Sequence, residues 1–186
     1  MVENNVVNSV DFLGLWHASG HHQIFESWLD PAKYRDVKIC CCKIDVIGLL
    51  ERSSDELDKR TGLGVRYAYM HAMRRPFQSK AAAKALYDNF LGRMVNFARW
   101  EADAARKGDA FQCMEIEEAI WALGEAAHAF EDSYSPAHTG FQLWPTEPIK
   151  HVLREPDSAI SGTGVIEATK GKFGPELDYI LNACSH

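Results

Sequence analysis

The sequence predicts an all-α fold, because apolar residues recur at helical spacing in two long stretches and only short irregular joints interrupt the chain. The longer stretch runs from Ser79 to about Arg106, and the second runs from Ile116 into His128 and Asp132. There is no internal repeat and no low-complexity tract. A length of 186 residues suits one domain with a sizeable core. We therefore expect a compact multi-helix domain.

Shorter elements are expected before the long helices. Residues 22–29 predict a short helix that the following Asp-Pro pair ends. Residues 37–50 are ambiguous, because their β-branched content allows a strand, whereas their length and surroundings favour a buried helix. Gly62 and Gly64 mark a joint before a helix that holds His71.

The two long helices carry the clearest periodicity. The apolar positions of the first are Leu86, Phe90, Met94, Ala98 and Ala102, beside Ala82, Phe97 and Ala105. Those of the second are Ile116, Ile120, Leu123, Ala127 and Phe130. Lys107-Gly108-Asp109 predicts the stop between them. Three prolines from Pro145 to Pro156 predict a loop around a short helical turn, and Pro175 to Cys184 predicts a last helix.

Charge and hydropathy exclude some functions. The net charge of -6 disfavours a protein that coats duplex nucleic acid, although a metal site can bind one phosphodiester without a basic surface. No segment approaches the roughly 18 consecutive apolar residues of a membrane span, and the first residues lack a basic segment followed by an apolar one. We therefore expect no transmembrane segment and no anchor or export signal within the chain.

The cysteines do not suggest a disulfide framework. Five cysteines are an odd number, and Cys40, Cys41 and Cys42 are consecutive, so their side chains should diverge. Adjacent side chains rarely converge on one ion, which also disfavours a metal site in this run. We expect small buried apolar residues here.

The run HAFEDSYSPAH, from His128 to His138, is the main candidate for chemistry. His128 and Asp132 are four residues apart on one helical face, and His138 follows the break at Ser135-Pro136. A carboxylate has two oxygens, so Asp132 could bridge two cations while each histidine serves one of them.

Other candidate ligands lie on both sides of this run. His151 and Glu155 repeat the four-residue spacing, and His71 follows two acidic residues, Asp55 and Asp58, either of which could share an ion with it. Two sites then emerge, one from Asp58, His71, His128 and Asp132, and one from His138, His151 and Glu155. Taken singly, a histidine is usually a hydrogen-bonded core or surface residue, and a His/Glu pair is usually a solvated face.

From about Trp16 to Glu155, the order and spacing of these residues resemble the zinc-dependent phospholipase C group and its relatives, the fungal zinc nucleases that cleave single-stranded nucleic acids. The resemblance implies an all-helical fold, a cluster of two or three Zn²⁺ ions, and Asp58 rather than Asp55 as ligand. It also implies that Asp58 orients or deprotonates the attacking water, with Asp132 as the bridging ligand. Behind the ligands, Glu131 and Glu125 are candidates to hold the histidines.

The segment WHASGH resembles the element that holds the third zinc in that family. Trp16 would supply its amino group and carbonyl, and His21 would share the ion with Asp132. Fifteen residues precede Trp16, however, and an amide nitrogen is a very poor ligand.

Those fifteen residues carry a second resemblance. VNSVDFLGL, which ends at Leu15, resembles the end of the Rhs-repeat core, whose DPxGL signature precedes a variable C-terminal toxin, although Phe12 replaces the proline. The resemblance implies a cleavage junction between Leu15 and Trp16, with residues 1–15 as the end of the core and 16–186 as the toxin domain. We therefore expect cleavage to expose Trp16 and complete the third site.

Together the resemblances imply a zinc-dependent phosphodiester hydrolase, most simply a phospholipase C-type toxin that attacks membrane phospholipids. A nuclease for single-stranded nucleic acid and a non-catalytic zinc-stabilised module remain alternatives. Phe141 and Trp144, with Phe77, would meet a lipid or a base, although such aromatics are more often core. The Rhs resemblance further implies a shell before release, a cognate immunity protein, and secretion or delivery into a target cell.

Overall fold

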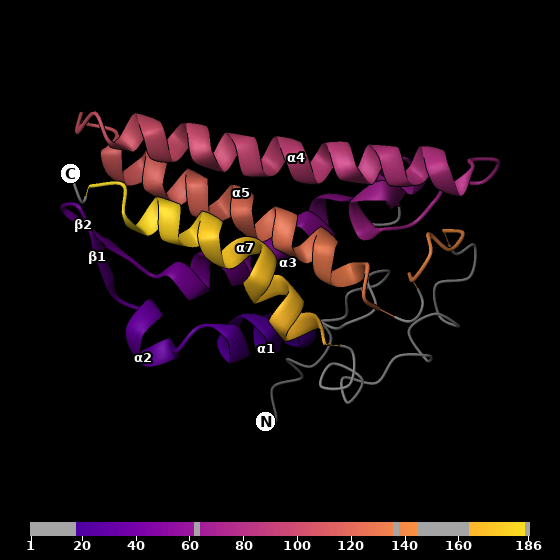
Figure 1. Ribbon diagram of the computed structural model, residues 1–186, viewed down its shortest axis with the longest axis horizontal. Coiled ribbons are helices and arrows are strands. Elements are labelled where there is room, and N and C mark those ends of the chain that lie inside the picture. The colour runs from indigo at the N-terminus through magenta and orange to yellow at the C-terminus, as the bar shows by residue number, and fades with distance from the viewer. Residues whose placement is uncertain (1–17, 62–63, 136–137, 145–163, 185–186) are drawn as a thin grey trace, which may run out of the picture.

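The computed structural model describes residues 18–61, 64–135, 138–144 and 164–184, and helices dominate these ranges (Figure 1). The helices are α1 (Ala18–Trp28), α2 (Pro31–Tyr34), α3 (Val46–Thr61), the 3-10 helix η1 (Val65–His71), α4 (Lys80–Ala105), α5 (Gln112–Asp132) and α7 (Val165–Leu181). The described strands, β1 (Val37–Ile39) and β2 (Cys42–Ile44), form one antiparallel hairpin. The prediction of a mainly α-helical fold is confirmed.

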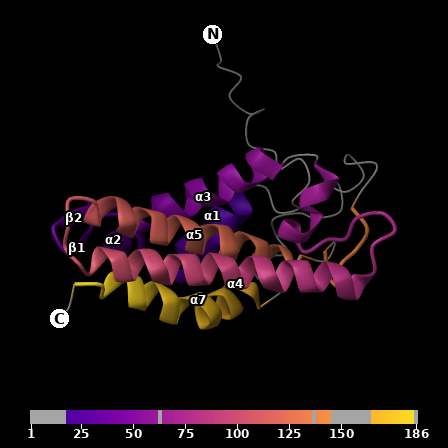
Figure 2. The ribbon, with the colours of Figure 1, turned by 90° about the horizontal axis from the view of Figure 1, so that it is seen from above.

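Helix α5 is the centre of the molecule. It contacts α4, α3 and α7, and α3 and α7 lie on opposite sides of it (Figure 2). Every residue from Ala122 to Ala129 is buried. A helix that is enclosed on all sides needs small residues, and this stretch is rich in alanine. Its last turn, which carries His128 and Asp132, is therefore held rigidly in the core.

One glycine sets the distance between α3 and α5. A Cβ atom at Gly124 would lie 1.9 Å from Ser53 Oγ and 3.1 Å from the Leu50 backbone. Only a residue without a side chain allows this approach. The close packing brings the polar face of α3 against His128.

The boundaries predicted for α4 are confirmed to within one residue. Ser79 caps the helix, since its hydroxyl accepts a hydrogen bond from Ala82 N at 3.1 Å. Gly108 follows the helix with φ +69°, as the stop predicted. The apolar face is partly different, because Leu86 and Phe97 are each 38% exposed.

The prediction of a helix over residues 37–50 is wrong for its first half. Residues 37–44 form the hairpin, and α3 begins only at Val46. Ile39 and Ile44 point into the core from this hairpin, as their β-branched side chains favour. Length and helical surroundings were thus poor guides to this segment.

The expectation of unpaired, buried cysteines is also wrong. Disulfides join Cys40 to Cys184 and Cys42 to Cys113, and Cys41 is a free, exposed thiol. The two residues of the hairpin turn, Cys40 and Cys41, point apart as expected, but the fold brings separate partners to the neighbouring cysteines. Pairing depends on tertiary contacts over 144 and 71 residues, which the run of three cysteines does not reveal.

The last helix is longer than expected. It begins at Val165 after Gly164, whose φ is +70°, so Pro175 lies inside α7 rather than at its start. Phe173, Leu177 and Ile180 are buried against the core, and this packing holds the helix through the proline.

The loop expected over Pro145 to Pro156 lies outside the described residues. Among the described helices, none combines the length and the apolar character that a membrane crossing requires.

Candidate metal centre

Six of the predicted ligands converge at the C-terminal end of α5. They come from different elements: His21 from α1, Asp58 from α3, His71 from η1, His128 and Asp132 from α5, and His138 from the segment after it. Five of these side chains are fully or almost fully buried, and Asp58 is 14% exposed. Buried titratable groups at this density need compensation from each other or from a bound cation.

The first cluster consists of Asp58, His71, His128 and Asp132. His71 Nδ1 lies 2.9 Å from Asp132 Oδ2, 3.7 Å from Asp58 Oδ1 and 3.3 Å from His128 Nε2. His128 Nε2 in turn lies 3.1 Å from Asp58 Oδ1 and 3.3 Å from Asp132 Oδ2. The structure brings these four predicted ligands close together, with both aspartates beside His71 and His128.

These distances match a set of ligands around one ion. Two ligand atoms that each lie about 2.0–2.1 Å from a tetrahedral Zn²⁺ are separated by roughly 3.4 Å. All five separations in the cluster scatter around that value. Asp58, His71 and His128 can therefore hold a metal ion with small adjustments, and Asp132 lies close to both of these histidines.

The second cluster uses the other oxygen of Asp132. Oδ1 lies 3.6 Å from His21 Nε2 and 3.9 Å from His138 Nδ1. His21 also stacks on His128, with ring centroids 4.1 Å apart, and His21, His128 and Asp132 form a second group that could hold an ion. Asp132 thus faces one pair of histidines with each oxygen, the arrangement of a bridging carboxylate.

Hydrogen bonds behind the cluster fix two of the histidine rings. His71 Nε2 lies 2.8 Å from Thr61 Oγ1, whose hydroxyl donates to Leu57 O at 2.6 Å and therefore accepts from His71. His21 Nδ1 donates to Glu131 Oε2 at 2.7 Å. In both rings the nitrogen that faces the cluster is then the one with a lone pair for a metal.

Ser54 supports His128 in the same way. Its Oγ lies 2.8 Å from His128 Nδ1, and the fully buried pair holds the ring so that Nε2 faces Asp58 and Asp132. Ser54 and Thr61 were missed in the sequence. The signal was available for Ser54, which lies four residues before Asp58 on the same face of α3.

The two suggested glutamates differ in role. Glu131 supports His21, as described above. Glu125 instead accepts hydrogen bonds from Arg60 at 3.0 Å and from Trp121 Nε1 at 3.1 Å. The suggestion that Glu125 holds a ligating histidine is therefore wrong for the described contacts.

Burial and charge act against each other throughout the cluster. Burial alone would raise the pKa of Asp132 and of Asp58, but the charge of His128 and its hydrogen bonds hold both below the ordinary value. Burial would lower the pKa of His128, and the two carboxylates raise it well above the ordinary value. Burial and the charge of His128 also oppose protonation of His21, yet hydrogen bonds with Asp132 and Glu131 raise its pKa to about 9.

The geometry separates Asp58 from Asp55. Asp55 lies one turn earlier on α3, where Oδ1 is 2.9 Å from His22 Nε2 in a half-buried pair. This pair lies outside both groups of potential ligands. Asp58 is the acidic residue of α3 that belongs to the cluster.

The aromatic residues suggested for substrate binding lie near the cluster but are poorly exposed. Backbone hydrogen bonds join residues 142–144 to Arg74, and this places the Trp144 ring 5.7 Å from the His71 ring. Trp144 is only 4% exposed, so the expectation of an exposed side chain is wrong for this residue and core packing explains it. Phe141 is half-buried, edge-on to Tyr87, whereas Phe77 is fully exposed.

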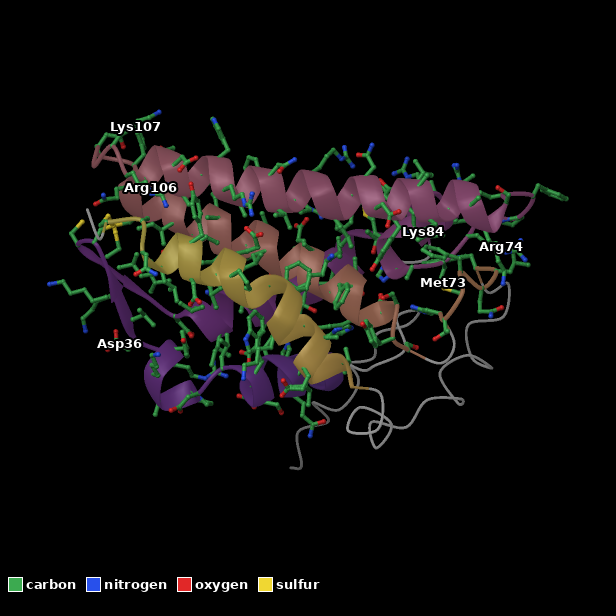
Figure 3. All side chains as sticks on the ribbon, in the orientation of Figure 1. Asp36, Met73, Arg74, Lys84, Arg106 and Lys107 are labelled. Carbon is green, nitrogen blue, oxygen red and sulfur yellow. A yellow bond between two sulfur atoms is a disulfide. The ribbon has the colours of Figure 1, made fainter. Side chains whose placement is uncertain are left out.

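Figure 3 labels Met73 and Arg74 at this end of the molecule, and Arg106 and Lys107 at the opposite end. The remaining predicted site residues are Leu15, Trp16, His151 and Glu155, and these lie outside the described residues. The third-ion element at Trp16, the pair that would complete the site of His138, and the cleavage junction therefore stay predictions.

Comparisons of this chain with known proteins found no matching family model, no matching curated protein and no matching solved structure.

Proposed function

We propose that the protein is a zinc-dependent phosphodiester hydrolase, and more specifically a phospholipase C-type toxin that acts on membrane phospholipids. The observation that carries the proposal is the position of Asp132, whose two oxygens face two different pairs of buried histidines. Such a carboxylate suits two neighbouring cations, which is a common arrangement in enzymes that cleave phosphodiesters.

The donor set favours zinc. Imidazole nitrogens and carboxylate oxygens are both good zinc ligands, whereas Mg²⁺ and Ca²⁺ prefer oxygen alone. Asp58, His71, His128 and Asp132 would hold one ion. Asp132 and His21 would hold another, which the amino group of Trp16 would complete after cleavage at Leu15. His138 would join His151 and Glu155 at a third position.

The chain's own residues account for the remaining steps. When bound, zinc would lower the pKa of a coordinated water to about 7 and offset the charge of the phosphate oxygens. Asp58 is the least buried member of the first cluster, with 14% of its side chain exposed. The carboxylate of Asp58 would orient the attacking water or accept its proton, by resemblance to the family.

The mixture of ligands disfavours the alternative of a purely structural site. Structural zinc sites are usually closed by four cysteine or histidine ligands. Here two carboxylates belong to the first cluster, and one of them is partly accessible. The toxin context, the immunity protein, the Rhs shell and delivery into a target cell rest on the resemblance of residues 1–15 alone.

The substrate can be tested directly. Zinc-loaded protein, with and without cleavage after Leu15, is incubated with phosphatidylcholine vesicles and with single-stranded DNA. We expect release of diacylglycerol and phosphocholine from the vesicles. If only the DNA is cleaved, the protein is a nuclease and not a phospholipase.

A variant of the bridging residue provides the control. Asp132→Asn keeps the size of the side chain and removes its charge, and we expect it to abolish hydrolysis in both assays. Hydrolysis at the wild-type rate would contradict the proposal. If the wild-type protein hydrolysed neither substrate and Asp132→Asn failed to fold, the structural module would be favoured instead.

A further inference from the structure

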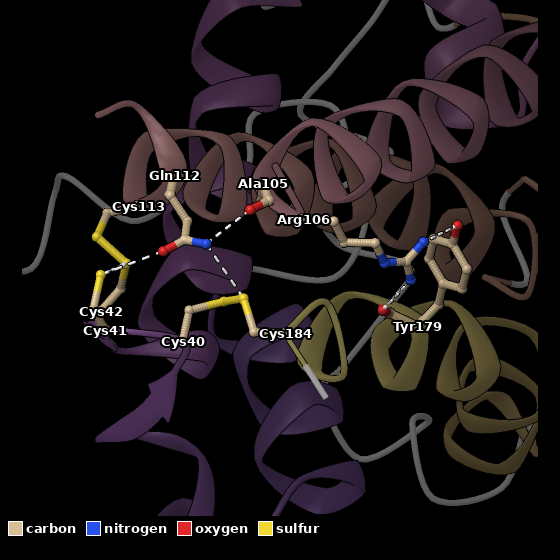
Figure 4. Close-up of a disulfide and its surroundings, with 9 residues drawn as sticks. All are labelled: Cys40, Cys41, Cys42, Ala105, Arg106, Gln112, Cys113, Tyr179 and Cys184. Carbon is tan, nitrogen blue, oxygen red and sulfur yellow. Dashed lines mark hydrogen bonds between the residues drawn. A yellow bond between two sulfur atoms is a disulfide. The ribbon is translucent and has the colours of Figure 1, made fainter. Parts of the chain in front are cut away.

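All five cysteines gather at the end of the molecule opposite the metal centre. The hairpin turn contributes Cys40, Cys41 and Cys42, the first turn of α5 contributes Cys113, and the segment after α7 contributes Cys184 (Figure 4). Gln112 lies between the two disulfides. Its Oε1 accepts from the Cys41 thiol at 3.4 Å, while its Nε2 donates to Cys184 Sγ at 3.4 Å and to Ala105 O at 2.8 Å.

The free thiol lies close to one disulfide. Cys41 Sγ is 3.8 Å from Cys42 Sγ, and the sulfur atoms of Cys41, Cys42 and Cys113 all lie within 4.8 Å of one another. Cys41 and Cys113 are exposed, so solvent, a reductant or a metal ion can reach the group. Adjacent cysteines usually diverge, but the sulfur atoms of Cys41 and Cys42 lie close together here, and the third sulfur of the group comes from α5.

We propose that Cys41, Cys42 and Cys113 form a second metal site, for a thiophilic ion such as Zn²⁺, when the Cys42–Cys113 disulfide is reduced. The disulfide and the metal are then alternative states of the same three sulfur atoms. The site holds the hairpin to α5 in both states, through an S–S bond in one and through shared coordination in the other.

The spacing of the sulfurs supports coordination. Two thiolates on a tetrahedral Zn²⁺, each about 2.3 Å from the ion, are separated by roughly 3.8 Å. Cys41 and Cys42 already have this separation. Cys113 needs only to move away from Cys42 once their bond is broken, and the exposed start of α5 leaves room for that movement.

Conversion of the disulfide into the metal site begins with reduction. A dithiol or phosphine reductant supplies two electrons, the bond between Cys42 Sγ and Cys113 Sγ breaks, and each sulfur takes up one proton. Binding of the ion then releases three protons, one from each thiol, because thiolates are the ligands. A water molecule can fill the fourth position, and Cys41 gives up its hydrogen bond to Gln112 Oε1 when it becomes a thiolate.

Cobalt titration tests the proposal with the full chain. Co²⁺ bound by thiolates gives a thiolate-to-cobalt charge-transfer absorption, which a histidine and carboxylate centre lacks. We expect this band to reach the intensity of one thiolate-bound Co²⁺ per chain in protein reduced with a phosphine and given excess Co²⁺, and to be absent from the oxidised protein. Reduced protein without the band, folded or unfolded, overturns the proposal.

Two variants locate the sulfurs. Cys41→Ser should weaken cobalt binding by at least tenfold, as judged from the charge-transfer band of the reduced protein. The double variant Cys40→Ser/Cys184→Ser removes the other two cysteines and should keep the band at full intensity. A band that survives Cys41→Ser unchanged, or that disappears in the double variant, overturns the assignment. Because the readout is specific to sulfur, failure here would leave the proposed hydrolase unaffected.

Discussion

The two ends of α5 hold their reactive groups in different ways. At the C-terminal end, side chains from four helices and the segment after α5 meet in a fully packed interior, and hydrogen bonds from Ser54, Thr61 and Glu131 orient the rings. At the N-terminal end, disulfides join the hairpin of β1 and β2 to the start of α5 and to the segment after α7. Cys113 and Asp132 are nineteen residues apart, or about 28 Å along the helix.

The two ends of α5 are therefore stabilised by different means, one by packing and hydrogen bonds and the other by covalent cross-links. The buried centre depends on packing and outer hydrogen bonds, so it should respond to substitutions that hardly change overall stability. The sulfur end depends on chain connectivity, so its loss should lower stability without changing the distant ligands. The following substitutions test that separation.

The largest effect is expected at Asp58. Asp58→Asn removes a ligand and the candidate base, so we expect kcat for phosphodiester hydrolysis to fall by roughly 10²–10⁴-fold, with less bound zinc by elemental analysis. Asp55→Asn is the matched control, because it changes the neighbouring turn of α3 and only the pair with His22. Equal losses of kcat and of bound zinc in both variants would mean that α3 contributes negative charge rather than a specific ligand.

At the other end, we expect the double variant Cys40→Ser/Cys184→Ser to lower the free energy of unfolding by about 4 kcal/mol. The lost disulfide closes a loop over a sequence separation of 144 residues and ties the end of the chain to the hairpin. Chemical denaturation under oxidising conditions measures the effect. The folded variant should keep its full zinc content, and a parallel loss of zinc would show that the two ends are coupled.

A smaller effect should follow from Ser54→Ala. Loss of the hydrogen bond to His128 Nδ1 should weaken zinc binding by about 10–100-fold, measured by competition with a chelating dye. Ser53→Ala is the control next to it, because Ser53 Oγ donates to Leu50 O within its own helix. If Ser53→Ala weakened binding as much, the cause would be the packing of α3 and not the orientation of His128.

The smallest effect concerns pH. With a pKa of about 9, His21 is protonated at neutral pH, and its proton must leave before the ring can bind an ion. Zinc affinity of the second cluster should therefore rise roughly tenfold per pH unit up to about pH 9. Calorimetry at several pH values measures the slope, and His21→Gln should reduce it by the one proton that His21 releases.

The same group predicts an opposite trend without zinc. In the presence of a chelator, His21 contributes stability that is fully present below its ordinary pKa of 6.5 and is lost as the pH rises through about 9. Thermal melts with and without zinc should therefore diverge with pH. Parallel melting curves would argue that His21 holds no ion.

Prediction from sequence succeeded where the signal is local. The helical period and the Ser79 cap located α4, and the spacing of His128 and Asp132 placed both on one face of α5. It failed where long-range contacts decide. The cysteine pairs join distant segments, and Pro175 is tolerated inside α7 because neighbouring residues bury the helix.

The metal centre lies between these extremes. In the sequence, only the resemblance favours Asp58 over Asp55, because both are acidic residues of α3 and both are partly buried. The fold separates them through the Gly124 contact, which brings one turn of α3 against His128 and leaves the other beside His22.

Both ends of helix α5 are held in place, the first by the Cys42–Cys113 disulfide and the last by the contacts of His128 and Asp132. Inserting or deleting one residue between Cys113 and His128 would turn one end relative to the other by about 100°. Neither the hairpin nor the cluster could follow that rotation. The number of residues between these two points is therefore strongly constrained. An insertion of seven residues would nearly restore the angle, but it would also lengthen the helix by about 10 Å.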